Sequence, residues 1–161
     1  MKIIAFDPGY DRLGWAVGET QNLKLKVKSF GCITTSKEDT LFHRYRIIID
    51  EVEKLLIEHE PTQAATESLF FFSNQKTAMK VAEVRGIITG CLLKRNIEIS
   101  EYTPIQIKQA AAGHGRADKV AVDKMVRLQL NLNPKEKIID DTIDALAILL
   151  THSIRSQSKL I

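Results

Sequence analysis

The first 34 residues alternate between apolar runs and turn residues, a pattern typical of consecutive strands. The segment Lys2–Asp7 (KIIAFD) is apolar at every position between its ends, which predicts a central strand covered on both faces. Pro8 and Gly9 end this strand. Residues 13–19 (LGWAVGE) and 25–34 (LKVKSFGCIT) predict two further strands. Lysines alternate with apolar side chains in the last of these, so we expect it to be half exposed near a sheet edge.

After residue 40 the apolar residues recur every three or four positions, which is the period of an α-helix. Leu41, Tyr45, Ile48, Val52 and Leu55 follow this spacing and share one face. Because charged residues fill the positions between them, the segment is predicted to be an amphipathic helix. These charged residues are Arg44, Asp50, Glu51 and Lys54.

The rest of the chain continues the alternation of strand-like and helix-like segments. Pro61 follows the first helix, and the short run after it predicts a strand that ends at Glu67. Pro104 suits the first turn of a helix, which Gly113 and Gly115 then end. Five strands interleaved with helices predict an α/β layered domain. The elements predicted after residue 61 are a strand at 62–67, a helix from 73 or 74 to 94, a strand at 97–102, a short helix opening at 103–104, a helix at 119–130 and a last helix from about 140.

Length and composition indicate a single domain. With 161 residues and 44% hydrophobic content, the chain is long enough for one well-buried core and too short for two domains of ordinary size. The sequence has no repeat and no Gly-rich or Ser-rich stretch that would mark a linker, so we expect one domain over residues 1–161. The net charge of +3 permits a nucleic-acid partner without requiring one, because an acidic metal site can offset a separate basic surface.

The cysteines and the longest apolar runs indicate the environment in which the protein is expected to work. Cys32 and Cys91 belong to no CxxC motif or Cys/His cluster, which fits a reducing environment. The apolar run before Asp7 is too short for a signal peptide, and the run at 145–150 (ALAILL) is far short of the roughly 20 residues that span a bilayer. We therefore expect a soluble, cytoplasmic protein with no membrane partner.

Four acidic residues at the margins of hydrophobic segments carry the clearest chemical signal. Asp7 and Glu67 end predicted strands, and if those strands are parallel neighbours their carboxylates lie at the same edge of the sheet. Asp141 and Asp144 are one turn apart on one face of the last predicted helix. Gathered carboxylates repel one another and raise each other's pKa unless a cation compensates them. The four acids therefore predict a divalent-metal site, and magnesium suits such oxygen ligands.

Four sequence blocks follow one another along the chain: DPG at 7–9 with Leu13-Gly14, TES-x-F at Thr66–Phe70, QIKQAAAGHGRADK at Gln106–Lys119, and DxxDALA at 141–147. In this order they resemble the RuvC family of Holliday-junction resolvases. The resemblance spans nearly the whole chain, and the order and spacing of the blocks make it specific.

This resemblance implies an RNase H-like fold, with a five-stranded mixed sheet and helices on both faces. It also implies a homodimeric endonuclease that cuts four-way DNA junctions symmetrically during recombination and repair. The implied cofactor is Mg²⁺, with two ions in each active site and Mn²⁺ as a substitute. Cooperation with a branch-migration motor is a further implication of the family.

The resemblance also implies roles for individual residues. The four acids match the family's metal-binding catalytic residues, and the DxxDALA register favours Asp141 over its neighbour Asp140, although Asp140 and Asp144 are also spaced to share a helix face. Lys108 and Lys119 match basic positions near the scissile phosphate and the DNA backbone. Phe70 matches an aromatic residue that can stack on bases near the junction centre, and the adjacent Phe71 and Phe72 leave the identity of the stacking residue open.

A basic surface and a dimer interface are expected outside the acidic site. The predicted helix from Ser73 to Lys94 is expected to contribute to the contact between two copies, because small residues dominate its first half and let a partner approach closely. Lysines and arginines on this helix and after Gly115 are expected to follow the DNA backbones. The candidates are Lys76, Lys80, Arg85, Arg116 and Lys124.

Each singled-out residue also has a structural interpretation. Asp7 before Pro-Gly could begin a turn, and Asp141 could complement the positive end of its helix. Lys108 and Lys119, taken alone, resemble ordinary surface lysines. His152 is expected near the end of the last helix, where it would interact with the helix dipole.

Two other classes of function remain open from the residues. The DPGxxxxG pattern resembles the phosphate loop of actin-like sugar kinases and ATPases, but those proteins usually need two such domains. The other class is a junction-binding protein without cleavage, or an RNase H-like nuclease with a different substrate such as RNA. A synthetic four-way junction, tested with and without magnesium, separates these possibilities.

Overall fold

The computed structural model describes residues 1–68 and 75–158, except for the side chains of residues 75–77 and 158. Strands and helices follow one another in the predicted order, and each lies within a few residues of its predicted bounds. The elements are β1 (Lys2–Asp7), β2 (Arg12–Gln21), β3 (Lys24–Thr34), α1 (Leu41–His59), β4 (Gln63–Glu67), α2 (Gln75–Lys94), β5 (Glu98–Tyr102), α3 (Pro104–Ala112), α4 (Lys119–Gln129) and α5 (Asp140–Ser158).

The five strands form one mixed sheet in the order β3-β2-β1-β4-β5. β1, β2 and β3 pair in antiparallel fashion, whereas β1 with β4 and β4 with β5 pair in parallel. The central position of β1 explains its continuous apolar run, and the edge position of β3 explains its alternating lysines. The mixed five-stranded sheet expected from the family resemblance is confirmed.

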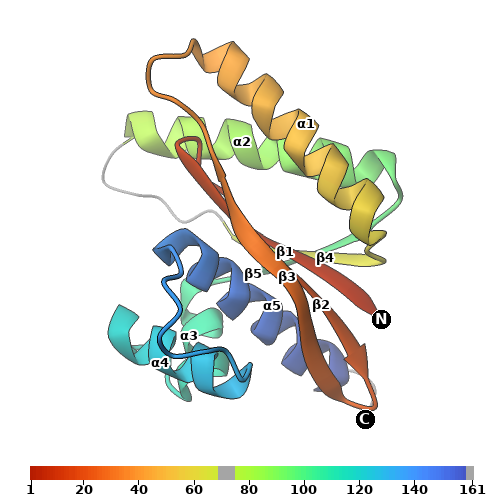
Figure 1. Ribbon diagram of the computed structural model, residues 1–161, viewed down its shortest axis with the longest axis vertical. Helices are drawn as coiled ribbons and strands as arrows, with labels where there is room; N and C mark the ends of the chain where they lie inside the picture. The colour runs from red at the N-terminus through yellow and green to blue at the C-terminus, as the bar shows by residue number, and fades with distance from the viewer. Residues whose placement is uncertain (69–74, 159–161) are drawn as a thin grey trace.

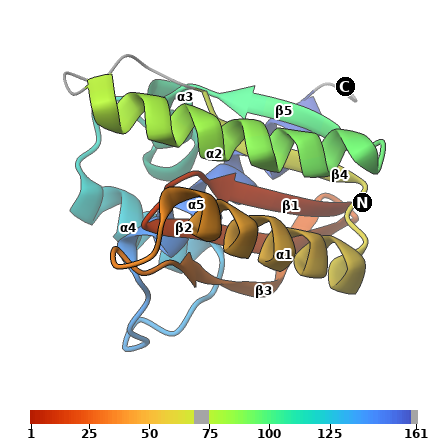
Figure 2. The ribbon, with the colours of Figure 1, turned by 90° about the horizontal axis from the view of Figure 1, so that it is seen from above.

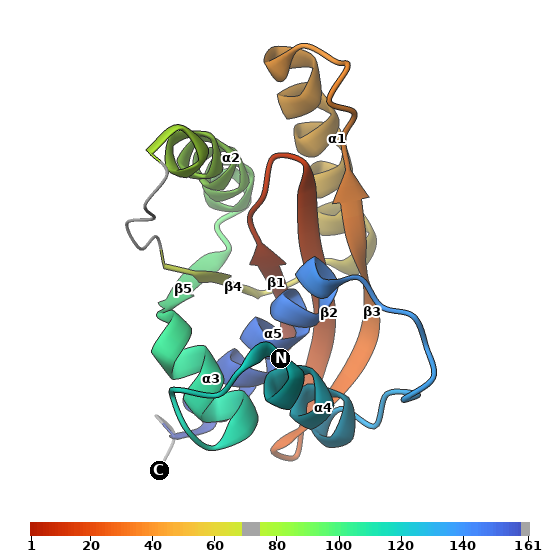
Figure 3. The same ribbon diagram turned by 90° about the vertical axis from the view of Figure 1, so that its left-hand side faces the viewer.

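Helices cover both faces of this sheet. Figure 2 shows α1 and α2 on one face, and Figure 3 shows α5 on the other face with α3 and α4 beyond it. Successive side chains of a strand point to opposite faces, so β1 contributes to two cores. Ile4 and Phe6 belong to the core under α1 and α2, whereas Ile3 and Ala5 pack in the core beneath α5.

Two charged or titratable residues occupy places that the sequence interpretation did not expect. Arg44 was grouped with the solvent-facing charges of the first helix, but it is buried because it lies four and eight residues before Ile48 and Val52, on the same helix face. His152 was expected near a helix end, but α5 continues six residues beyond it to Ser158. His152 is instead buried in the middle of the fold, where its Nδ1 atom lies 2.9 Å from the hydroxyl group of Tyr102.

The helices described within residues 1–68 and 75–158 are all too short or too polar to cross a membrane.

Candidate active site

Two of the four acids lie at the ends of neighbouring parallel strands. β1 and β4 are paired so that Phe6 is the Cα partner of Thr66, and the next residues in the two strands are Asp7 and Glu67. Both residues therefore emerge at the carboxyl edge of the sheet, which is where open α/β sheets place their sites. The crossover between these strands runs through α1, as the sequence pattern predicted.

The start of α5 brings the other two acids to the same edge. Gly14 of β2 is the Cα partner of Asp7, and a Cβ atom at Gly14 would lie 1.8 Å from the backbone oxygen of Asp141. The hydroxyl group of Thr142 donates a hydrogen bond of 3.0 Å to the backbone oxygen of Gly31 in β3. Direct contact with two strands therefore holds the first turn of α5 beside Asp7, and Figure 3 shows this end of α5 against the sheet.

Lys119 and Lys108 flank the acids on the side of α3 and α4. The side chain of Asp118 accepts a 2.8 Å hydrogen bond from the backbone of Ala121 and so begins α4 at Lys119. Lys119 Nζ lies 3.8 Å from Asp144 Oδ2. A pocket of about 420 Å³ opens between these elements and the end of β4. Its lining comprises Glu67, Ser68, Pro104, Ile107, Lys108, Lys119, Val122, Asp144 and Ile148.

The electrostatics of Asp7 place it at the centre of the acidic group. Burial is the largest cause of its shift, and together with neighbouring charges it raises the pKa of Asp7 from 3.8 to about 8. The neighbouring charges that raise this pKa are Asp144, Glu67 and Asp141, in that order. Lys119 opposes them. An isolated turn aspartate would not show such a shift, so the turn interpretation of Asp7 alone does not account for its environment.

Two other acids share this field. Burial raises the pKa of Glu67, the charge of Asp144 raises it further, and the two lysines lower it. Burial is also the main cause that raises the pKa of Asp144, where Lys119 acts in the opposite direction. Asp144 raises the pKa of both Asp7 and Glu67, so these carboxylates are electrostatically linked and protons and cations compete for their oxygens.

Asp140 and Asp141 face different surroundings. Asp141 raises the pKa of both Asp7 and Asp144, and its Oδ2 atom is buried. Asp140 is exposed and lines a second pocket of about 260 Å³ that it shares with Lys119 and Asp144; it raises the pKa of Asp144 but does not contribute to that of Asp7. This difference favours Asp141 as the partner of Asp7, in agreement with the sequence register.

The acids fit a divalent cation by position and chemistry, although their carboxylates do not yet converge. Asp141 Oδ2 is buried and accepts no hydrogen bond from any described residue, and its charge is paired with Arg12 Nε at 3.0 Å. Carboxylate oxygens are the ligands that Mg²⁺ and Mn²⁺ prefer. Among the described residues, however, no three acidic, histidine or cysteine side chains lie close enough to form a ready-made cage. Coulomb forces act over longer distances than ligation, so the shifted pKa values and the open arrangement are compatible.

The structure places some of the remaining residues that were expected to contact DNA. Phe70, with its neighbours Phe71 and Phe72, lies outside the described residues, as does the side chain of Lys76. Lys80 Nζ lies 4.9 Å from the centre of the Tyr10 ring.

Three further basic candidates can be placed. Arg116 and Lys124 are exposed, in the loop before α4 and on α4 itself. Arg85 is 19% exposed and forms an ion pair with Glu101 of β5, an arrangement that favours a structural role over a contact with DNA.

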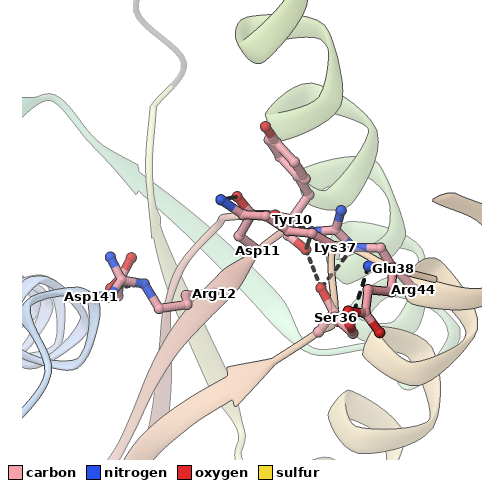
Figure 4. Close-up of polar contacts among 9 residues, drawn as sticks. Tyr10, Asp11, Arg12, Ser36, Lys37, Glu38, Arg44 and Asp141 are labelled. Atoms are coloured by element: carbon pink, nitrogen blue, oxygen red, sulfur yellow. Dashed lines mark hydrogen bonds and ion pairs between the residues drawn. The ribbon is translucent and has the colours of Figure 1, made fainter. Parts of the chain in front are cut away.

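Arg44 is a site-supporting residue that the sequence interpretation missed. Its guanidinium donates to the backbone oxygen of Tyr10 at 2.7 Å and to Thr35 Oγ1 at 2.9 Å, and it forms an ion pair with Asp11. The loop between β1 and β2 is thereby attached to α1, as Figure 4 shows. Its spacing of four and eight residues from Ile48 and Val52 was the signal in the sequence that could have indicated its burial.

Comparisons with known proteins agree with this geometry. The family model described as "Crossover junction endodeoxyribonuclease RuvC" matches residues 3–152. The RuvC of Petrotoga mobilis is 43% identical over 152 residues, covering 94% of this chain and 93% of that protein. The RuvC of Thermosipho melanesiensis is 43% identical over 148 residues, covering 92% of this chain and 94% of that protein. The solved structure of T. thermophilus RuvC with a Holliday junction substrate has a TM-score of 0.91 and 31% identity, covering 99% of this chain and 96% of that chain.

The fold and the acidic edge define a nuclease of the RNase H-like class. Within that class, the chain belongs to the RuvC family of crossover junction endodeoxyribonucleases. Its activity is the resolution of four-way DNA junctions. The family as a whole consists of nucleases that depend on divalent metal, and this membership, rather than an actin-like phosphate loop, accounts for the DPG turn.

Proposed function

We propose that this chain hydrolyses two symmetric phosphodiester bonds of a four-way junction at a site made by Asp7, Glu67, Asp141 and Asp144. The observation that carries the proposal is the convergence of β1, β4 and the start of α5 at one edge of the sheet. The raised pKa of Asp7, about 8, supports the proposal, because a cation that binds this carboxylate would replace the proton that burial favours.

Two Mg²⁺ ions, for which Mn²⁺ substitutes, are proposed to bind among these acids and to supply an activated water and stabilisation of the leaving oxygen. Asp7 ends β1, between β4, which carries Glu67, and Gly14 of β2, on which the first turn of α5 rests. Asp141 contributes the buried Oδ2 atom, and the more exposed Asp144 faces the pocket beside Glu67. The protein carries these groups on two strands and a helix, so their backbone positions are set before substrate arrives.

Lys119 and Lys108 are proposed to neutralise the phosphate as charge builds on it. Lys119 is the first residue of α4, its side chain is 79% exposed, and its Nζ atom lies near Asp144. Lys108 lines the same pocket from α3. Cations placed beside the acids would stabilise negative charge on the phosphate that the acids themselves repel.

The DNA backbone is proposed to follow the exposed basic residues around this pocket. Arg116, Lys119 and Lys124 lie before and along α4, and Lys80 lies on α2. Figure 1 shows α2 and α4 on opposite sides of the sheet, so the two groups flank it. Phe70 and Lys76 complete the expected DNA contacts, although Phe70 and the side chain of Lys76 lie outside the described residues. Contacts of this kind make affinity fall steeply with salt.

A homodimer through α2 is proposed because a junction has two equivalent strands to cut. The outward face of α2 carries small residues between two exposed apolar ones, which are Met79 and Leu93. A Cβ atom added at Gly86 or Gly90 would meet no described atom within 4 Å, so this face is open to close approach of a second helix. Two copies related by a two-fold axis would present two sites at a fixed separation.

The experiment that tests the proposal is cleavage of a synthetic four-way junction by Asp7→Asn and Asp141→Asn variants, with Asp140→Asn as the matched control. Both site variants are expected to bind the junction and to lose cleavage in Mg²⁺ by at least about 100-fold. Asp140→Asn is expected to cut paired, symmetric positions at nearly the wild-type rate. Cleavage by Asp7→Asn at the wild-type rate would overturn the assignment, and preference for RNA or linear duplex would overturn the substrate.

A further inference from the structure

An ion pair between Arg12 and Asp141 lies within the acidic site. Arg12 Nε is 3.0 Å from Asp141 Oδ2, and their side chains are 53% and 23% exposed. The contact lacks hydrogen-bond geometry, and Oδ2 accepts no hydrogen bond from any other described residue. The guanidinium therefore neutralises the carboxylate by proximity. Figure 4 shows Arg12 extending from the start of β2 toward Asp141.

The backbone, rather than a long flexible reach, brings the two residues together. Arg12 is the first residue of β2 and lies two positions before Gly14, on which the first turn of α5 rests. The hydrogen bond from Thr142 to Gly31 attaches the same turn to β3. Asp141 is thus held beside Arg12 in any state that keeps α5 on the sheet.

The nearest alternative partner of Arg12 is already occupied. Asp11 precedes Arg12 in the chain, but its carboxylate is paired with the buried guanidinium of Arg44 and lies 3.9 Å from Lys37 Nζ. Figure 4 shows Arg44 and Lys37 on the α1 side of this loop, while Arg12 points the other way. Asp11 therefore pairs with Arg44 of α1, whereas Arg12 pairs with Asp141.

A divalent cation and the Arg12 guanidinium place incompatible demands on Asp141. Mg²⁺ binds carboxylate oxygen at about 2.0 to 2.1 Å, and its double charge repels a guanidinium that stays within contact distance of the same oxygen. Oδ2 is the buried oxygen of Asp141, and it is also the atom that Arg12 approaches. The half-exposed Arg12 side chain has solvent into which it can move.

We propose that Arg12 is a built-in competitor of the metal at Asp141. It neutralises this carboxylate in the metal-free protein, and it moves away when a divalent cation binds. The inference rests on the metal site proposed above and adds a residue that sets how tightly that site binds its cation.

Calorimetric titration of the full-length, DNA-free protein with MnCl₂ at fixed pH tests this inference without any measurement of cleavage. Arg12→Met and Arg12→Gln are expected to bind Mn²⁺ about three- to fivefold more tightly than the wild type, which corresponds to loss of one partly exposed ion pair. Arg12→Lys keeps the charge and is expected to stay near the wild-type affinity. Arg95→Met, which removes an arginine paired with Glu53 away from the site, is the matched control and is expected to change nothing.

The same titration in an Asp141→Asn background distinguishes the role of Arg12 from the existence of the metal site. There, Arg12→Met is expected to have no further effect, because its partner is gone. Unchanged or weaker Mn²⁺ binding by Arg12→Met and Arg12→Gln in the otherwise wild-type chain overturns the role of Arg12 and leaves the metal site standing. Absence of Mn²⁺ binding by the wild type, or wild-type binding by Asp141→Asn, overturns both. Thermal melts in EDTA establish that each variant is folded.

Discussion

Asp7 and Gly14 face each other across the β1–β2 ladder, and Gly14 is the residue on which the first turn of α5 rests. This relationship links the acid at the end of β1 to the pair of acids at the start of α5. The helix can approach so closely only because position 14 carries no side chain. The position of these acids relative to one another therefore depends on a residue that has no functional side chain.

Gly14→Ala is expected to lower the free energy of unfolding by about 2 to 3 kcal/mol and to weaken Mn²⁺ binding at least tenfold. The added Cβ would lie 1.8 Å from the backbone oxygen of Asp141, so the start of α5 must move away from Asp7. Urea unfolding and Mn²⁺ titration measure the two effects. Gly86→Ala, on the open face of α2, is the control and is expected to keep the wild-type Mn²⁺ affinity. Normal metal binding by Gly14→Ala would contradict this role for the close contact.

The metal-free protein is expected to lose stability as the pH rises from about 5 to 9. The folded state raises the pKa of Asp7 from 3.8 to about 8, so between these values it holds a proton that the unfolded chain has released. The stabilisation is complete below the unfolded pKa and disappears as the pH passes through the folded pKa. Glu67 and Asp144, whose pKa values are also raised, act in the same direction.

Asp7→Asn isolates the contribution of Asp7 to this pH dependence. In EDTA, the free energy of unfolding of the wild type is expected to fall with rising pH over this range. For the variant the fall is expected to be smaller by at least about 2 kcal/mol, because asparagine does not ionise. Chemical unfolding at a series of pH values provides the measurement. Added Mn²⁺ is expected to restore the stability of the wild type at pH 9 but not to stabilise the variant equally. Parallel pH profiles for the two proteins would contradict the burial of an ionisable Asp7.

Arg44→Met is expected to destabilise the protein by about 3 kcal/mol and to reduce cleavage. The substitution leaves the backbone oxygen of Tyr10 and the carboxylate of Asp11 without their buried cation, and both belong to the loop that carries Arg12. Unfolding and junction cleavage are measured on the same samples. The matched control is Arg46→Met, two residues along α1 and exposed, which is expected to change stability by less than about 0.5 kcal/mol.

Lys119→Met is expected to reduce the cleavage rate of bound junction by about 100-fold while leaving Mn²⁺ affinity equal or slightly tighter. Lys119 lies 3.8 Å from Asp144 and lowers the pKa of Asp7, so its charge acts on both the phosphate and the acids. Single-turnover cleavage and Mn²⁺ titration separate the two roles. Lys54→Met, on the exposed surface of α1, serves as the control. A variant that binds junction poorly but cuts bound junction at the normal rate would reassign Lys119 to DNA binding alone.

Gly90→Arg is expected to convert a dimer to monomers, because a long charged side chain would stand on the open face of α2. Analytical ultracentrifugation measures the change in mass. The monomer is expected to nick one strand of a junction without the paired second cut. A stable dimer of this variant would move the interface away from the centre of α2.

The sequence was sufficient to predict the strands, the long helices and the edge at which the acids gather. Those predictions rest on periodicity and on strand ends, which are local properties of the chain. The burial of Arg44 was missed because its partners, Tyr10 and Thr35, are distant in sequence and compensate its charge only in the folded state.

His152 was misplaced for a similar reason. The helix continues past it through the mostly polar run SIRSQS, and its partners Tyr102 and Gln63 lie on β5 and β4. The pairing of Arg12 with Asp141 depends on α5 packing against β2, which the acids alone do not specify. Sequence patterns therefore located the acidic residues, whereas the ion pairs of Arg12 and Arg44 became visible only through tertiary contacts.

The most direct test of the central claim is a crystal structure of the protein soaked in Mn²⁺, with the metal located by its anomalous scattering. The account predicts anomalous peaks among Asp7, Glu67, Asp141 and Asp144, with the Arg12 guanidinium moved away from Asp141. Peaks coordinated by Asp140 without Asp7, or no peak at this edge of the sheet at saturating Mn²⁺, would contradict it.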